Sequence, residues 1–147
     1  MSEKSFQNYW MKIGKPLNHY RIALVNGTGF PDILALHGPK HSLIELKDFA
    51  LGKRGDKKIA PLFKPSQFPW YIKYFQNGGT RLFVAFRICD HDESNKRYGL
   101  WHLTKEQVLH MDDLYYSDLS GDLGGEYKEY SSCKTMIEDI EKWGENR

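Results

Sequence analysis

The chain has 147 residues, of which 40 % are hydrophobic and 14 % aromatic, so it can form one domain with a substantial core. No apolar stretch reaches the length of a membrane span, and the first ten residues lack the apolar segment of a signal peptide. The two cysteines, Cys89 and Cys133, form no metal-ligand or redox pattern, so a reduced intracellular protein is the simplest expectation.

The net charge of +2 conceals an uneven distribution. Residues 1–89 carry 14 Lys and Arg against 5 Asp and Glu, a net charge of +9, whereas residues 90–147 carry 7 against 14, a net charge of −7. A cationic excess of this size is typical of a protein with a polyphosphate partner. An ordinary solvated surface would explain the acidic part better than the basic part.

Residues 2–13 predict an amphipathic first helix. Its apolar residues recur at the spacing of one helical face: Phe6, Tyr9, Trp10 and Ile13. Ser2 can cap this helix, and Glu3 lies one turn before Phe6 on the same face. An acid on a buried face needs a partner, whereas an acid that only complements the helix N-terminus needs none. Both interpretations of Glu3 stay open.

The next segments predict a strand and then a β-hairpin. His19–Val25 has the composition of a strand, and residues 26–29 form a glycine-rich bend after it. Two short apolar runs follow, at Ile33–Leu36 and Ser42–Lys47, on either side of a turn at Gly38-Pro39. Two such runs around a turn are typical of a hairpin.

The turn fixes the register of this hairpin. A four-residue turn centred between Gly38 and Pro39 pairs residues whose numbers sum to 77, so Asp32 falls opposite Glu45, and Lys47 lies on the same face as Glu45. Opposed residues have Cβ atoms about 5 Å apart, so two like charges there are destabilising unless a cation lies between them. Oxygen ligands in this number suit Mg²⁺ or Mn²⁺ rather than zinc. Alternatively, Asp32 is a turn residue, and Glu45 and Lys47 line a solvated strand face.

Pro31-Asp32 followed, thirteen positions after the aspartate, by Glu45-Leu46-Lys47 resembles the PD-(D/E)xK nuclease signature. The resemblance extends over residues 2–88 to the virus-type replication-repair nuclease (VRR-NUC) domain, in particular its stand-alone phage versions, which resemble Holliday-junction resolvases. It implies that Asp32, Glu45 and the Leu46 carbonyl bind Mg²⁺ or Mn²⁺ and that Lys47 is catalytic. It also implies that Glu3, on the first helix, completes the metal site.

Residues 48–58 follow the Glu-x-Lys strand. They mix glycine with basic residues and show no regular period, which predicts a mobile loop. The basic residues expected to neutralise DNA phosphates are Lys53, Arg54, Lys57, Lys58 and Lys64. Such contacts dominate affinity without specifying sequence. The alternative is an ordinary solvated basic loop.

A second long helix is expected to begin after Ser66, because Pro69 is tolerated in a first helical turn. Gln67 lies on the same side of this helix as Tyr71 and is expected to face the sheet. Pro65, Gln67 and Trp70 match a Pro-x-Gln-x-x-Trp arrangement of the VRR-NUC domain. The resemblance implies that Gln67 assists catalysis.

The remaining segments are expected to complete a mixed sheet and its helical cover. Thr80–Ile88 is too apolar for an edge strand, and the helix before it suggests a crossover connection. A further strand at Tyr98–Leu103 is followed by a capping box at Thr104 and Gln107, then by an acidic loop over residues 112–125. Ser131 or Ser132 is expected to cap a final helix, whose apolar face comprises Met136, Ile137, Ile140 and Trp143.

Together these features predict a single α/β nuclease domain with a restriction-endonuclease-like central mixed sheet flanked by helices. Its core is expected over residues 2–103, with a C-terminal helical extension over residues 104–147. The expected function is Mg²⁺- or Mn²⁺-dependent hydrolysis of DNA in the cytoplasm of a prokaryotic or phage-infected cell. Branched DNA is the expected substrate, as for a Holliday-junction resolvase.

Two further function classes stay open at this stage. One is a restriction- or repair-type nuclease that acts on linear, flap or single-stranded DNA, and the other is a non-catalytic DNA-binding module of the same fold. A resolvase must cut two symmetric strands, which favours a homodimer. Trp101 and Trp143 could supply its contact, unless they only complete the core of the monomer.

Overall fold

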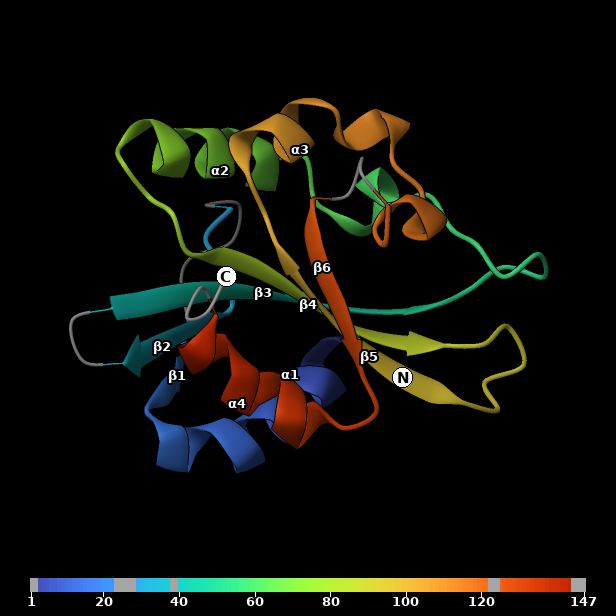
Figure 1. The fold of residues 1–147 in the computed structure, drawn as a ribbon, viewed down its shortest axis with the longest axis horizontal. Helices are drawn as coiled ribbons and strands as arrows, with labels where there is room; N and C mark the ends of the chain where they lie inside the picture. The colour runs from blue at the N-terminus through green and yellow to red at the C-terminus, as the bar shows by residue number, and fades with distance from the viewer. Residues whose placement is uncertain (1–2, 23–28, 38–39, 122–124, 144–147) are drawn as a thin grey trace.

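The computed structural model describes residues 3–22, 29–37, 40–121 and 125–143 of the chain (Figure 1). The strands in these residues are β1 (His19–Arg21), β2 (Ile33–His37), β3 (Lys40–Ala50), β4 (Leu82–Cys89), β5 (Lys96–His102) and β6 (Glu126–Tyr130). They form one six-stranded sheet in the order β1-β2-β3-β4-β5-β6. Neighbouring strands are antiparallel except for β3 and β4, which are parallel.

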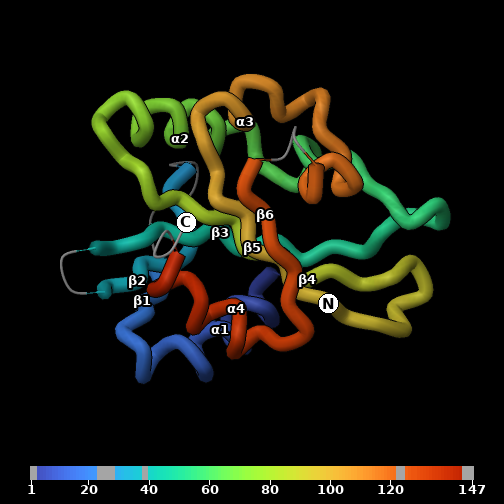
Figure 2. Tube along the Cα trace, viewed as in Figure 1, coloured from blue at the N-terminus to red at the C-terminus, as the bar shows by residue number. Residues whose placement is uncertain are grey.

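Helices cover both faces of this mixed sheet, as the sequence predicted (Figures 1 and 2). The α-helices are α1 (Glu3–Gly14), α2 (Gln67–Gln76), α3 (Lys105–Leu109) and α4 (Cys133–Lys142). Short 3-10 turns lie at η1 (Lys15–Leu17), η2 (Ala60–Leu62), η3 (Met111–Asp113) and η4 (Tyr116–Asp118). α1 and α4 pack on one face of the sheet, whereas α2 and α3 pack on the other. None of the helices in the described ranges is both long and apolar enough to cross a membrane.

The hairpin of β2 and β3 has the predicted register. Ile33 pairs with Ile44, and the pairing continues without a slip to His37 and Lys40, so all partner numbers sum to 77. Apolar side chains at alternate positions of β2 face the core, where Ile33 and Ala35 are fully buried. A slip of one residue would turn these side chains to the other face of the sheet, which is why the register is so strongly specified.

The expected crossover connection between two parallel strands is also confirmed. α2 lies between β3 and β4 in the chain, and these two strands pair in parallel from Leu43 and Leu82 to Ala50 and Cys89. Every residue of β4 is buried, because this strand has a neighbour on each side and helices over both faces. Its composition, apolar except for Arg87, therefore reflects its central position.

Helix ends confirm two of the capping predictions. The capping box of α3 forms between Thr104 and Gln107. Ser132, rather than Ser131, caps α4, and its hydroxyl accepts a hydrogen bond from the Thr135 backbone N–H at 3.2 Å. The N-terminal part of α1 is described only from Glu3, so the predicted cap at Ser2 lies outside the described residues.

Residues 104–147 are not a purely helical extension, which corrects the sequence-based expectation. β6 adds a strand to the sheet beside β5. Met136 and Ile140 of α4 are buried in the same apolar cluster as Phe6 and Trp10 of α1, so α4 belongs to the core. β6 was missed because three of its five residues are charged and only Tyr130 is buried.

Other expectations also need correction. Tyr9 is 41 % exposed, so the buried face of α1 consists of Phe6 and Trp10, while Ile13 is only partly buried. β1 spans His19–Arg21 in the described residues, and residues 23–28, which include the predicted continuation to Val25 and most of the predicted bend, lie outside them. The same is true of the turn residues 38–39.

Candidate active site

The predicted carboxylates, Asp32 and Glu45, lie at the point where the pairing between β2 and β3 stops. β2 begins opposite Ile44, so in the described ladder β3 pairs only with β4 from Glu45 onward. Asp32 immediately precedes β2, and its backbone N–H donates to the Ile44 carbonyl at 3.1 Å. The short β2 thus leaves a gap in the strand pairing of β3, called the notch below, with Asp32 at its end and Glu45 and Lys47 on β3 beside it. Side chains fill this gap, since Glu45 and Lys47 are buried.

Lys47 is the centre of this notch and is almost completely buried. Its Nζ atom lies 3.2 Å from Glu45 Oε2 and 3.4 Å from Glu3 Oε1, and it donates a hydrogen bond to Gln67 Oε1 at 3.2 Å. These partners come from β3, the first residue of α1 and the first residue of α2. An ammonium group has three donors, so each donor has an oxygen within reach and the side chain is held in one orientation.

Asp32 is held against the backbone of β3. Its Oδ2 atom accepts a hydrogen bond from the Leu46 backbone N–H at 2.8 Å, and its Oδ1 atom accepts one from Gln7 Nε2 at 3.1 Å. The first bond places the carboxylate next to the peptide that follows Glu45. The second comes from α1, one helical turn after Glu3, so Gln7 and Glu3 face the same site.

Glu45 carries a buried oxygen atom without a protein partner. The side chain is buried, and Glu45 Oε1 has no hydrogen-bond partner among the described residues. The Tyr71 hydroxyl is also buried and lacks a partner in that part of the chain. Burial and the nearby carboxylates of Glu45, Asp32 and Glu3 raise the pKa of Tyr71 well above its usual value. Leaving a buried polar atom unsatisfied costs about 1–3 kcal/mol, so this arrangement favours a polar or cationic ligand between these groups.

The raised pKa values of the two carboxyl groups also favour a cation beside them. Burial, followed by the charge of Asp32, raises the pKa of Glu45 from 4.5 to about 8, although Lys47 opposes this shift. Burial also raises the pKa of Asp32, against the hydrogen bond from Leu46 and the charge of Lys47. One lysine therefore does not compensate fully for two buried carboxylates, and an additional cation would favour their charged forms.

The donor set fits a hard divalent cation. Asp32 and Glu45 offer carboxylate oxygens, one of them without a protein partner, and Mg²⁺ and Mn²⁺ prefer such oxygen ligands. Leu46 lies between Glu45 and Lys47 beside the Asp32 carboxylate, whereas Glu3 contacts Lys47 and its side chain is 42 % exposed. Across the described ranges there is no group of three or more His, Cys, Asp or Glu side chains arranged for metal binding. The roles of Asp32, Glu45, Leu46 and Glu3 as ligands stay predictions.

Some site residues were missing from the sequence-based set. Tyr71 lies four residues after Gln67 on α2, and Gln7 lies four residues after Glu3 on α1. Residues at this spacing share one side of a helix, so each could have been found from its predicted neighbour. Phe63, whose ring centroid lies 5.0 Å from Lys47 Nζ, carries no comparable signal in the sequence.

The basic loop after β3 is more ordered than the sequence predicted. The Lys57 carbonyl accepts a hydrogen bond from the Tyr116 backbone N–H at 2.7 Å, and Lys58 forms a β-bridge with Tyr115. Asp56 accepts hydrogen bonds from the backbone and hydroxyl of Ser117 at 2.9 and 2.7 Å. The expectation of a mobile loop is therefore corrected, because the segment after α3 anchors its second half.

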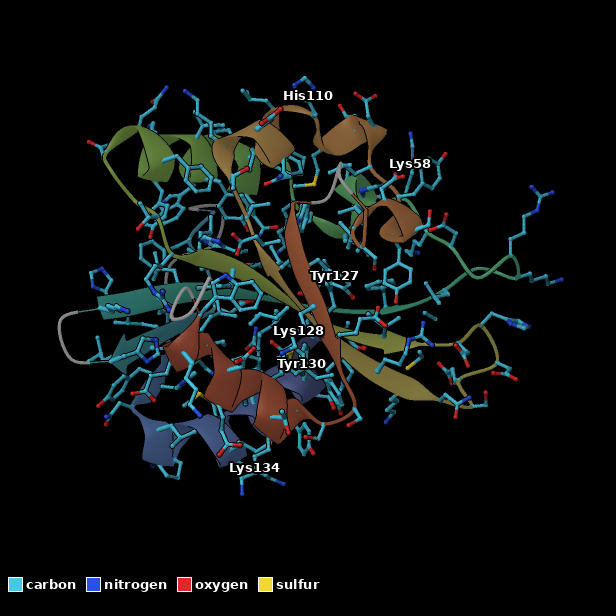
Figure 3. All side chains as sticks on the ribbon, in the orientation of Figure 1. Lys58, His110, Tyr127, Lys128, Tyr130 and Lys134 are labelled. Atoms are coloured by element: carbon cyan, nitrogen blue, oxygen red, sulfur yellow. The ribbon has the colours of Figure 1, made fainter. Side chains whose placement is uncertain are left out.

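Among the five basic residues predicted to bind DNA, Lys64 lies close enough to act on the carboxylates. Its backbone N–H donates to Gln67 Oε1 at 2.8 Å, and its charge lowers the pKa of Asp32. Lys53 and Arg54 are exposed on the loop that extends beyond the sheet in Figures 1 and 2, and Lys58 lies beside the segment after α3 in Figure 3. These residues form a basic extension rather than a wall of the notch.

Neutralising this extension tests its expected contact with DNA. We expect simultaneous replacement of Lys53, Arg54, Lys57 and Lys58 by glutamine to weaken duplex binding. The log–log salt slope should decrease by about 0.9 for each phosphate contact that is lost. Fluorescence anisotropy at several salt concentrations measures both quantities, and an unchanged slope would show that the loop is only solvated.

A scan against protein-family models and a search of curated proteins found no match to this chain. The geometry brings together four predicted residues from separate parts of the chain, Glu3, Glu45, Lys47 and Gln67, around one ammonium group. Asp32 joins them through the Leu46 peptide.

Proposed function

We propose that this protein is a metal-dependent deoxyribonuclease with a restriction-endonuclease-like core that hydrolyses phosphodiester bonds of DNA. The observation that carries the proposal is the grouping of the buried Glu45 and Lys47 with the half-buried Asp32, beside the part of β3 that β2 does not pair. The raised pKa of both carboxyl groups and the partnerless Glu45 oxygen support a cation at this place. The cationic excess of residues 1–89 supports a nucleic acid as the substrate.

The residues divide into metal ligands and groups that act on the attacking water. Asp32, Glu45 and the Leu46 carbonyl would hold Mg²⁺ or Mn²⁺, and Glu3 is a further candidate ligand. Such an ion, when bound, polarises the phosphate and lowers the pKa of the attacking water. Lys47, held by Gln67 and Glu45, orients that water or neutralises negative charge that develops at the phosphate. Gln67 is a positioning residue for Lys47.

A non-catalytic DNA-binding module explains the notch less well. Carboxylates repel phosphate, so a protein that only binds DNA gains nothing from Asp32 and Glu45 at this site. The burial of Glu45 also opposes its ionisation, which is a cost without a compensating cation. A catalytic role gives both features a purpose.

Branched DNA is the proposed substrate, because the resemblance is to stand-alone phage-type VRR-NUC domains. The homodimer that a resolvase needs cannot use Trp101 and Trp143, which are 0 % and 2 % exposed within the monomer core. This finding removes the contact suggested by the sequence but leaves the dimer as a proposal. The alternative is a nuclease that acts on linear, flap or single-stranded DNA.

A panel of labelled four-way junctions, flaps, duplexes and single strands tests both the activity and its selectivity. We expect cleavage with Mg²⁺ or Mn²⁺, no cleavage with EDTA, and the highest rate on a branched substrate. The mass in solution should be measured on the same sample. A strict monomer that cuts junctions no better than duplexes would contradict the resolvase assignment, and no cleavage of any substrate would contradict the nuclease assignment.

A further inference from the structure

A separate pocket with a volume of about 620 Å³ lies at the opposite end of β3 from Lys47. This volume is typical of sites for small ligands. Its walls are formed by Lys40 and His41 at the start of β3, by Trp70, Lys73 and Tyr74 of α2, and by residues 77–81. None of the ten described residues that line the pocket is acidic, so its surface favours an anionic ligand.

One wall of this pocket is aromatic and rigid. The rings of Trp70 and Tyr74 are stacked, with centroids 5.6 Å apart and planes at 13°, and Phe30 packs edge-on against Trp70 at 4.7 Å. The Tyr74 hydroxyl accepts a hydrogen bond from the Arg81 backbone N–H at 3.1 Å. The Tyr74 ring also lies so close to the backbone of Gly79 that a Cβ atom there would approach it within 2.3 Å. The position of this aromatic surface is therefore fixed before any ligand binds.

The cations of the pocket have different roles. The Arg81 guanidinium is bonded to Ser42 Oγ at 2.9 Å and to the carbonyls of Ile140 and Trp143 at 2.7 and 3.0 Å, so it is held by the protein. Lys40 and Lys73 are exposed at the rim. Their ammonium groups can therefore reach an anionic ligand without breaking a buried contact.

We infer that this pocket binds an unpaired nucleotide of a DNA strand, with its base against Trp70 and Tyr74 and its phosphates beside Lys40 and Lys73. Aromatic surfaces that stack bases, combined with cations along the backbone, are the means by which proteins bind single-stranded nucleic acid. A base inside a duplex is already stacked on both faces and cannot pack against this wall. The ligand is thus a single-stranded segment rather than a duplex.

The proposed nuclease function determines where along the DNA the bound nucleotide would lie, and this part of the inference rests on it. The five-residue step from Lys40 to Glu45 along β3 spans about 17 Å, at about 3.3 Å per residue. One strand of duplex DNA covers that distance in about five nucleotide steps of about 3.4 Å. The pocket would therefore hold a strand that leaves the duplex a few nucleotides from the cleaved bond, as at a flap or an open branch point.

Binding of a fluorescein-labelled five-nucleotide oligo-dT in EDTA, followed by anisotropy, tests the pocket without any cleavage. We expect K40Q/K73Q to weaken binding about tenfold and to reduce the log–log salt slope by about 1.4, because single strands lose about 0.7 per phosphate contact. Trp70→Leu should weaken oligo-dT binding about tenfold through lost stacking. It should leave the binding of an abasic oligomer of the same length unchanged.

The matched control is K105Q/K134Q, which removes the same charge from two exposed positions outside the pocket. Lys134 lies on α4, on the face of the sheet opposite α2 (Figure 3). This control should bind oligo-dT within about twofold of the wild type, since it loses only long-range attraction. Circular dichroism checks whether Trp70→Leu folds. If it does not fold, the comparison of oligo-dT affinity between K40Q/K73Q and K105Q/K134Q tests the pocket on its own.

Equal oligo-dT affinity of K40Q/K73Q and K105Q/K134Q would overturn the pocket assignment, even if the protein cleaves DNA. Conversely, a K40Q/K73Q-specific loss of binding in a protein that cleaves no substrate would support the pocket and contradict the nuclease. The two proposals can therefore fail separately.

Discussion

Glu45→Gln should reduce DNA cleavage by a factor on the order of 10³, because it removes a carboxylate charge from the proposed metal site. The substitution keeps the size of the side chain and the contact distance to Lys47, which is 3.2 Å in the wild type. Lys47→Met should cause a comparable loss by removing the ammonium group that Gln67 positions. Single-turnover cleavage of the best substrate, with Mg²⁺ and then Mn²⁺, measures both effects.

Glu106→Gln is the matched control for this loss, since it makes the same chemical change at an exposed position on α3. DNA binding in EDTA should persist in Glu45→Gln with little change near neutral pH, because burial keeps the metal-free Glu45 largely protonated below about pH 8. Wild-type cleavage by both Glu45→Gln and Lys47→Met would place the active site elsewhere in the molecule.

Local rules were sufficient to predict from the sequence which side chains lie together around Lys47. The turn position and the alternation of side chains in strands determined the pairing of β2 with β3, and with it the approach of Asp32 to Glu45. Helical spacing indicated that Gln67 faces the sheet and that Glu3 shares a face of α1 with Phe6, and both side chains contact Lys47. These positions could be predicted because each depends on residues close together in the chain or on one short connection.

Long-range packing was not predictable in the same way. The contact of Lys57 with Tyr116 joins segments that have no shared sequence pattern, so the loop after β3 was expected to be mobile. β6 was missed because a charged edge strand lacks the apolar alternation of a half-buried one. The orientation of Tyr71 toward the carboxylates depends on how α2 lies across the sheet, which tertiary packing decides.

The same buried carboxylate should make the stability of the metal-free protein depend on pH. Burial and the charge of Asp32 raise the pKa of Glu45 from 4.5 to about 8 in the folded state, so folding favours the protonated form. The contribution of protonated Glu45 to the free energy of unfolding is fully present below about pH 4.5 and is lost as the pH rises through about 8. A difference of 3.5 pKa units corresponds to at most about 5 kcal/mol of unfolding free energy at high pH. The raised pKa of Asp32 acts in the same direction.

Urea unfolding in EDTA at pH 5, 6, 7 and 8 measures this dependence in the wild type and in Glu45→Gln. Groups far from Glu45 cancel in the difference, whereas the titration of Asp32 changes together with Glu45 because the two carboxyl groups interact. Glu45→Gln should therefore gain stability relative to the wild type by several kcal/mol between pH 5 and 8. Adding Mg²⁺ or Mn²⁺ at pH 8 should then stabilise the wild type, because a ligand that binds only the folded state raises its stability with concentration. Glu45→Gln should respond far less, since it lacks one charged ligand. Parallel pH curves for the two proteins would show that Glu45 is ionised without penalty, and an equal response to the cation would show that the ion binds elsewhere.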